Sequence, residues 1–189
     1  MRATAVVPRG GCCCNGGMGG EMDIRVIEGF REGDRAELVA LLREYETSIG
    51  ISLCFQNFDA EVAGLPGAYA PPTGTMLLAR AAADGGLVGF VAARGLAGRD
   101  GACEMKRLFV RDAARGTGLG RRLAVSVIER ARALGFRTMH LDTLPSMTAA
   151  QALYRSLGFR QTDNYGASPH PGALYFALAL DGTGHGPGR

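Results

Sequence analysis

Residues 103–123, CEMKRLFVRDAARGTGLGRRL, decide the fold of this 189-residue chain. The run at 103–110 is short and largely apolar, which predicts a buried strand. After a turn at 111–114, the glycine-rich segment 115–120 leads directly into a helix predicted for 118–134. Its apolar face consists of Leu119, Leu123, Val127, Ala131 and Leu134. The segment therefore predicts a strand, a glycine-rich turn and a helix in succession.

The glycine-rich turn predicts an anion-binding site. The first backbone N–H groups of a helix have no intrahelical partners, and the helix dipole is positive at the same end. Glycines lack the Cβ atoms that would hold a phosphate away from these groups. Arg115, Arg121 and Arg122 add positive charge, and a guanidinium can grip a phosphate in a fork. We expect a ligand that carries phosphate; a turn without any ligand is the alternative.

Two common phosphate-binding patterns do not fit. The phosphate loop of nucleotide hydrolases needs a lysine inside the loop, whereas the only lysine, Lys106, lies upstream. The dinucleotide fingerprint needs a third glycine at position 121, where this chain has Arg121. A dinucleotide-dependent oxidoreductase is therefore disfavoured.

The arrangement Arg-x-x-Gly-x-Gly at 115–120 resembles the acetyl-CoA signature of the GNAT superfamily of N-acetyltransferases. A second motif, ALYRSLGF at 152–159, resembles the LYxxxGF motif of the same family. The resemblance covers roughly residues 22–180 and implies an α/β fold (α+β layers), with a mixed central sheet and helices on both faces. It also implies acetyl transfer from acetyl-CoA, as co-substrate and without a metal, to a primary amine that attacks the thioester directly.

The resemblance implies where acetyl-CoA would bind. The strand near 108–110 would pair with the pantetheine arm like an extra strand, provided its ladder is splayed open there, and would supply a backbone N–H to the oxyanion. Met147 departs from the family, because many members have asparagine at this place. The implied cofactor-binding residues are Leu108, Phe109, Val110, Arg115, Gly116, Thr117, Gly118, Leu119, Gly120 and Arg121.

Tyr154 is the candidate general acid. It shares a helix face with Leu153 and Leu157, so its side chain points towards the core, and a purely structural role is the alternative. In GNAT enzymes the matching tyrosine gives a proton to the leaving CoA thiolate. A phenol with a pKa of about 10 is a reasonable acid for a thiolate whose conjugate acid has a pKa near 8.5.

An alkyl amine is mostly protonated at neutral pH, so a base must take its proton before the attack. Glu104 begins the cofactor strand and Asp142 ends the strand after the cofactor helix. Family members use acidic residues at either kind of place, and we prefer Glu104; solvated carboxylates are the alternative. Asp59 and Glu61 are weaker candidates for an amine pocket, since a solvated helix face explains them more simply.

The remaining elements follow from apolar spacing and from glycine or proline signals. Asp34 with Glu37 predicts a capping box at the start of a helix that ends near residue 48. A short helix is predicted at 59–63 and a later one at 148–157. The further strands are predicted at 22–27, 75–81, 87–93, 138–141, 159–163 and 173–180, with the second and third joined as a hairpin.

Composition narrows the class of protein. A net charge of +3 is too small to favour nucleic acid, and no apolar run is long enough to cross a membrane. Cys12, Cys13 and Cys14 lack the spacing of a zinc site, and Cys54 and Cys103 lie in apolar surroundings, so we expect reduced cysteines, no metal and a cytoplasmic protein. The ends, 1–21 and 181–189, are rich in glycine and are expected to be disordered.

Two questions stay open at the level of sequence. A module that binds acyl-CoA without turnover, with a regulatory role, is the alternative to an enzyme. The amine acceptor is either a small molecule or a peptide. Because members of the GNAT family often form dimers, a homodimer is an option.

Overall fold

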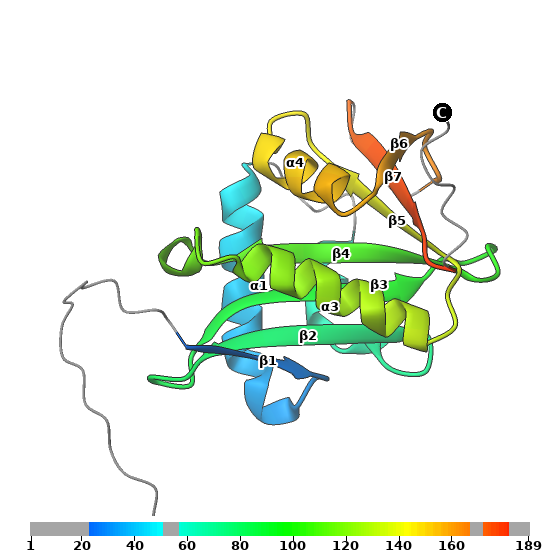
Figure 1. Cartoon of the computed structure of the whole chain (residues 1–189). Helices are drawn as coiled ribbons and strands as arrows, with labels where there is room; N and C mark the ends of the chain where they lie inside the picture. Colours follow the sequence, from blue (N-terminus) through cyan, green and yellow to red (C-terminus); the bar gives the residue numbers. More distant parts are fainter. Residues whose placement is uncertain (1–22, 51–56, 167–171, 182–189) are drawn as a thin grey trace, which may run out of the picture.

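The computed structural model describes residues 23–50, 57–166 and 172–181, and a seven-stranded mixed sheet lies at its centre (Figure 1). The strand order is β1-β2-β3-β4-β5-β7-β6. Only β4 and β5 pair in parallel; the other neighbours are antiparallel. The strands are β1 (Ile24–Glu28), β2 (Gly74–Ala81), β3 (Leu87–Gly95), β4 (Ala102–Val110), β5 (Thr138–Thr143), β6 (Arg160–Thr162) and β7 (Leu174–Ala179).

Helices cover both faces of the sheet, as predicted. In Figure 1, α3 (Leu119–Ala133) lies in front of the sheet and α1 (Arg35–Ile49) behind it. One core joins α3 and α4 (Thr148–Ser156) to the sheet, and a second core joins α1 and α2 (Phe58–Ala63) to the opposite face. Three short 3₁₀ turns complete the described chain: η1 (Glu32–Asp34), η3 (Gly67–Tyr69) and η4 (Asp112–Ala114).

The predicted apolar face of α3 is confirmed from Leu119 to Ala131, whereas Leu134 is the C-cap residue and is only partly buried. Leu119, Leu123 and Val127 are almost completely buried against the sheet. Close approach of this helix depends on Gly89 in β3, because a Cβ atom there would lie 2.9 Å from the Phe109 carbonyl oxygen and 3.2 Å from the Leu123 side chain. Burial of such side chains stabilises the fold by about 1.5–3 kcal/mol each. This packing holds α3, which directly follows the glycine-rich turn, against the sheet.

The predicted capping box at the start of α1 is wrong. Asp34 occupies the N-cap position but makes no capping hydrogen bond through its side chain. Instead, Arg80 of β2 donates to Asp34 at 2.7 Å and to Glu37 at 3.0 Å. A partly buried guanidinium is costly without carboxylate partners. The ion pairs of Asp34 and Glu37 with Arg80 therefore take the place of the local capping hydrogen bonds. The predicted end of α1 is confirmed, since Gly50 takes the left-handed conformation.

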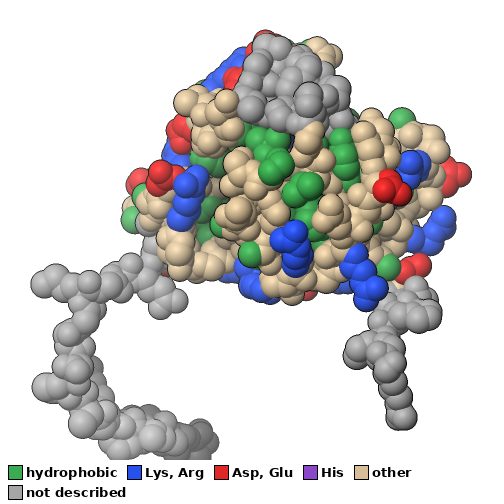
Figure 2. All heavy atoms as spheres, turned by 90° about the horizontal axis from the view of Figure 1, so that it is seen from above, with side chains coloured by type: hydrophobic (Ala, Val, Ile, Leu, Met, Phe, Trp, Pro, Cys, Tyr) green, Lys and Arg blue, Asp and Glu red, His purple; other side chains and the backbone are tan. Residues whose placement is uncertain are grey.

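The described surface has mixed charge on the face seen in Figure 2. Lys and Arg side chains lie at separate places, several of them beside acidic ones, and hydrophobic side chains reach the surface near the middle. Within the described ranges, no helix is long and apolar enough to span a membrane, and no group of His, Cys, Asp and Glu is arranged to hold a metal ion. The predicted tails at 1–21 and 181–189, apart from Asp181, lie outside the described residues, as do Cys12, Cys13, Cys14 and Cys54.

Candidate active site

β4, the predicted cofactor strand, carries a bulge on the side that pairs with β3 and separates from β5 on its other side. Arg107 has a φ of 61°, and the β3–β4 register shifts between Phe90 and Ala92. The extra residue places Lys106 and Arg107 on the same side of the sheet. Pairing of β4 with β5 extends only over 102–104, although both strands continue. The opening that a pantetheine arm needs therefore lies beside residues 108–110.

A pocket of about 390 Å³ lies at this opening. It gathers four of the predicted cofactor residues and adds side chains from the end of α1 and from the turn before α4. Met147, where many family members have asparagine, is one of its walls. The lining residues are Tyr45, Ser48, Ile49, Leu108, Phe109, Val110, Arg115, Ser146 and Met147.

The glycine-rich turn has the backbone geometry of an anion cradle. Gly116 and Gly118 have left-handed φ angles of 78° and 81°, and no atom lies within 4 Å of the place where either Cβ would stand. The N–H of Arg122 donates to the Gly118 carbonyl at 3.1 Å as α3 starts. The N–H groups of residues 119–121 precede that bond, so they are the ones a helix leaves for an anion.

The three arginines of this turn have different surroundings. Arg115, with 55% of its side chain exposed, contacts exposed Asp112 at 2.8 Å and the Val110 carbonyl at 3.1 Å. Arg121 donates to Ser156 of α4 at 2.7 Å. Arg122 donates to the Ile24 carbonyl of β1. The guanidinium of Arg122 therefore lies at the edge strand of the sheet and not at the turn. Of the three, Arg115 is best placed to exchange its partner for a phosphate.

Tyr154 is buried in the core, as its helix position predicts. It is 7% exposed and packs against Phe159 and Phe176, with ring centroids 5.9 and 6.4 Å away. Burial raises the pKa of the phenol, and the nearby Tyr45 and Asp142 raise it further. Tyr154 therefore carries its proton at neutral pH, as a phenol of ordinary pKa also does, and its raised pKa makes it a weaker acid than a solvated phenol.

The two candidate bases lie in one buried cluster of charges. Glu104 is 1% exposed and meets Arg94 and Lys106, each at 3.1 Å. Tyr165 donates a further hydrogen bond to Glu104 at 2.8 Å. Lys106 also pairs with Asp142 at 2.8 Å, and the Asp142 side chain is 15% exposed. Neither carboxylate is a solvated side chain, and Lys106 links the two.

A second ion pair connects α2 to the bulge. Arg107 donates to both carboxylate oxygens of Glu61 at 2.9 Å, and Tyr69 donates to Glu61 at 3.0 Å. Burial of Glu61 is the largest single influence and raises the pKa of the carboxyl, but the hydrogen bonds and charge of Arg107, with Tyr69 and Arg94, together lower it below its usual value. The prediction of a solvated helix face is thus wrong for Glu61, whereas Asp59 is 71% exposed.

Sequence reasoning missed the partners in both ion-pair groups. They are Arg94, Lys106, Arg107, Tyr69 and Tyr165. One signal was available: two basic residues, Lys106 and Arg107, stand next to each other inside a largely apolar strand. Adjacent residues of a regular strand face opposite sides, so burying both charges with partners on one side calls for a bulge.

The mixed sheet, with β4 opened beside a glycine cradle, is the arrangement that the GNAT resemblance implies. The model of the acetyltransferase (GNAT) family matches residues 36–159, and the chain belongs to this family. It is similar to an uncharacterized N-acetyltransferase of Schizosaccharomyces pombe, with 40% identity over 147 residues that cover 78% of this chain and 89% of the relative. It is also similar to the rat N-acetylaspartate synthetase, with 33% identity covering 71% of this chain and 44% of that one.

Solved structures share the fold. A GNAT-family acetyltransferase of Staphylococcus aureus aligns with a TM-score of 0.71 at 20% identity, covering 84% of this chain and 99% of that chain. The PaiA N-acetyltransferase of Thermoplasma acidophilum, solved in complex with coenzyme A, aligns with a TM-score of 0.65 at 16% identity, over the same shares. At these identities the likeness concerns the fold alone.

Proposed function

We propose that this chain transfers an acetyl group from acetyl-CoA to a primary amine by direct attack of the amine on the thioester. The observation that carries the proposal is the opening between β4 and β5, which runs from the glycine cradle to the buried charge cluster. A protein of the same fold has been solved with coenzyme A, which agrees with this ligand.

The residues at the opening suit each part of acetyl-CoA. The N–H groups of 119–121 and the exchangeable Arg115 would hold the pyrophosphate. The unpaired edge of β4 at 108–110 would bond the pantetheine amides as a neighbouring strand does. A backbone N–H of the same segment would donate to the thioester oxygen as negative charge develops there.

The reaction forms a C–N bond and breaks the C–S bond. Tyr154, which carries its proton at neutral pH, would give that proton to the leaving thiolate. The proton of the amine would pass to the carboxylates joined by Lys106. Of these, Asp142 is the one that solvent reaches, at 15% exposure, whereas Glu104 is covered by three donors. We therefore assign the proton acceptor role to this pair, with Asp142 as its accessible member.

An acceptor screen that follows free thiol tests this proposal. Purified protein with acetyl-CoA should release thiol only when a suitable amine is present, and acetyl-CoA should raise the melting temperature because it binds the native state. NADH serves as the matched control and should leave the melting temperature unchanged. The rat relative's name places amino acids among the acceptors to test. Binding of acetyl-CoA without thiol release from any acceptor would favour the non-catalytic module instead.

A further inference from the structure

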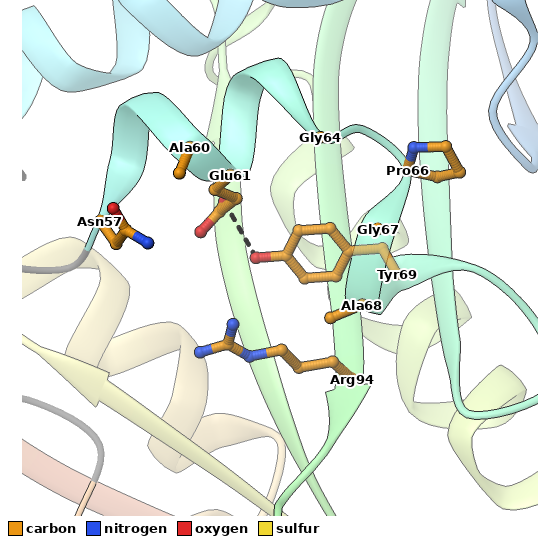
Figure 3. Close-up of a pocket in the computed structure, with 9 residues that line it drawn as sticks. All are labelled: Asn57, Ala60, Glu61, Gly64, Pro66, Gly67, Ala68, Tyr69 and Arg94. Atoms are coloured by element: carbon orange, nitrogen blue, oxygen red, sulfur yellow. Dashed lines mark hydrogen bonds between the residues drawn. The ribbon is translucent and has the colours of Figure 1, made fainter.

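A polar pocket of about 280 Å³ lies on the α2 side of the sheet, next to the bulge (Figure 3). Its walls come from α2, from the turn η3 and from the end of β3. This volume is just below the range of about 300–1,000 Å³ that is usual for ligand sites, which suits a molecule of about the size of an amino acid. Its lining residues are Asn57, Ala60, Glu61, Gly64, Pro66, Gly67, Ala68, Tyr69 and Arg94.

Two charged side chains line this pocket, and only one of them is available to a ligand. Both carboxylate oxygens of Glu61 already accept from Arg107, and Tyr69 donates to the same group. The Glu61 side chain is 12% exposed. The negative charge of Glu61 is thus neutralised within the protein by Arg107.

Arg94 is the other charged side chain, and 35% of it is exposed. Figure 3 shows it extending from β3 towards Glu61 and the Tyr69 ring. Its Nε and Nη2 atoms both approach a single oxygen of Glu104, at 3.2 and 3.1 Å. A guanidinium has five N–H donors in a planar fork, so this pairing leaves donors for a second partner.

A row of ion pairs with alternating charge begins at this pocket. Contacts run in sequence from Arg94 to Glu104, then to Lys106 and to Asp142. The positive end of this row lines the pocket, and the negative end lies on β5, close enough to Tyr154 to raise the pKa of its phenol. A molecule with an anionic group and an amine matches the polarity of this row.

We infer that the acceptor amine also carries a carboxylate, which Arg94 binds in this pocket. The inference rests on the proposed acetyl transfer and narrows its acceptor to small amino acids and related amino carboxylates. A carboxylate on a guanidinium gains charge-assisted hydrogen bonds, which contribute about 1.5–3 kcal/mol, or roughly 10- to 100-fold in KM.

Matched acceptors test the inference. Each amino acid is compared with its C-terminal amide and with the corresponding amine that lacks the carboxyl group, by thiol release from acetyl-CoA. The wild type should favour the amino acids by roughly 10- to 100-fold in kcat/KM. Arg94→Gln should abolish most of this preference, mainly through KM, and Arg94→Lys should restore part of it because it keeps the charge. Arg25→Gln, which removes an exposed arginine of β1, is the control and should keep the full preference.

Four outcomes decide the matter. Loss of preference in Arg94→Gln alone supports the inference. Equal use of amino acids and their amides by the wild type overturns it, and so does an Arg94→Gln variant that loses the same factor with every acceptor, since Arg94 would then only position Glu104. An absence of thiol release with all amines refutes the proposed transfer itself, and the inference falls with it.

Discussion

The two faces of β4 differ in what holds them together. On the face towards α3, Cys103 and Met105 lie in a core of apolar side chains. On the face towards α1 and α2, Glu104, Lys106 and Arg107 are each at most 5% exposed and each has an opposite charge as partner. Apolar contacts are non-directional and tolerate exchange, whereas a buried charge is costly without its partner. One strand thus combines a structural face with a face suited to chemistry.

The largest expected effect comes from breaking the charged face at one residue. Arg107→Met leaves Glu61 buried without its cation and should lower the free energy of unfolding by about 3–5 kcal/mol. The double variant with Glu61→Met removes both charges and should recover more than half of that loss. Urea unfolding of the wild type, both single variants and the double variant measures the coupling.

The apolar face supplies the contrast for this cycle. Leu119→Ala and Ile128→Ala, about 13 Å apart along α3, should each cost about 2–5 kcal/mol. Their effects should add to within about 0.5 kcal/mol. If the charged pair is equally additive, the two faces do not differ in the way described above.

Tyr154→Phe tests the one candidate catalytic side chain whose ring lies in the apolar core. The change removes an oxygen and keeps the ring that packs on Phe159 and Phe176. If the phenol protonates the thiolate, kcat should fall by about 100-fold or more, while affinity for acetyl-CoA should change little. Steady-state thiol release and calorimetry measure the two quantities. Full activity in a folded variant would leave Tyr154 with a packing role only.

The difference between the faces also decides what the sequence could predict. The α3 face follows from spacing: Leu119, Leu123 and Val127 indicate a helix with one buried side, and the glycines before them indicate the cradle. The charged face depends on pairs far apart in the chain, such as Glu61 with Arg107. The adjacent Lys106 and Arg107 indicate a bulge, but no local pattern specifies which carboxylate pairs with either of them. The capping-box prediction at Asp34 was wrong for the same reason: Asp34 precedes α1, whereas its partner Arg80 lies on β2, far along the chain.

Gly118→Val tests the glycine cradle. If the cradle binds the pyrophosphate, the affinity for CoA should fall by about tenfold or more. A branched side chain at the helix start would stand where the pyrophosphate approaches the N–H groups. Gly98→Val is the matched control, because Gly98 has a similar φ of 73° and equally open surroundings in the β3–β4 connection. Both variants should carry similar backbone strain, so a loss of affinity in both would contradict the assignment of the cradle. Calorimetric titration with CoA provides the comparison.

The smallest expected effect concerns His140, which extends the charged face onto β5. It is 9% exposed, its ring lies 4.8 Å from that of Tyr165, and its Nδ1 atom has no hydrogen-bond partner among the described residues. Burial lowers the pKa of the imidazole, the nearby Arg99 lowers it further, and Glu104 opposes them. The unfolded chain therefore binds a proton at this residue more readily than the native protein does.

The contribution of His140 to stability should be complete above the unfolded pKa of about 6.5. The free energy of unfolding should fall as the pH drops below that value, by at most about 1.4 kcal/mol between pH 7.5 and 5.5. His140→Asn should flatten this part of the profile in urea unfolding, while the carboxylates titrate at lower pH. An unchanged slope in the variant would mean that another group is responsible, and that protonating His140 costs the folded protein nothing.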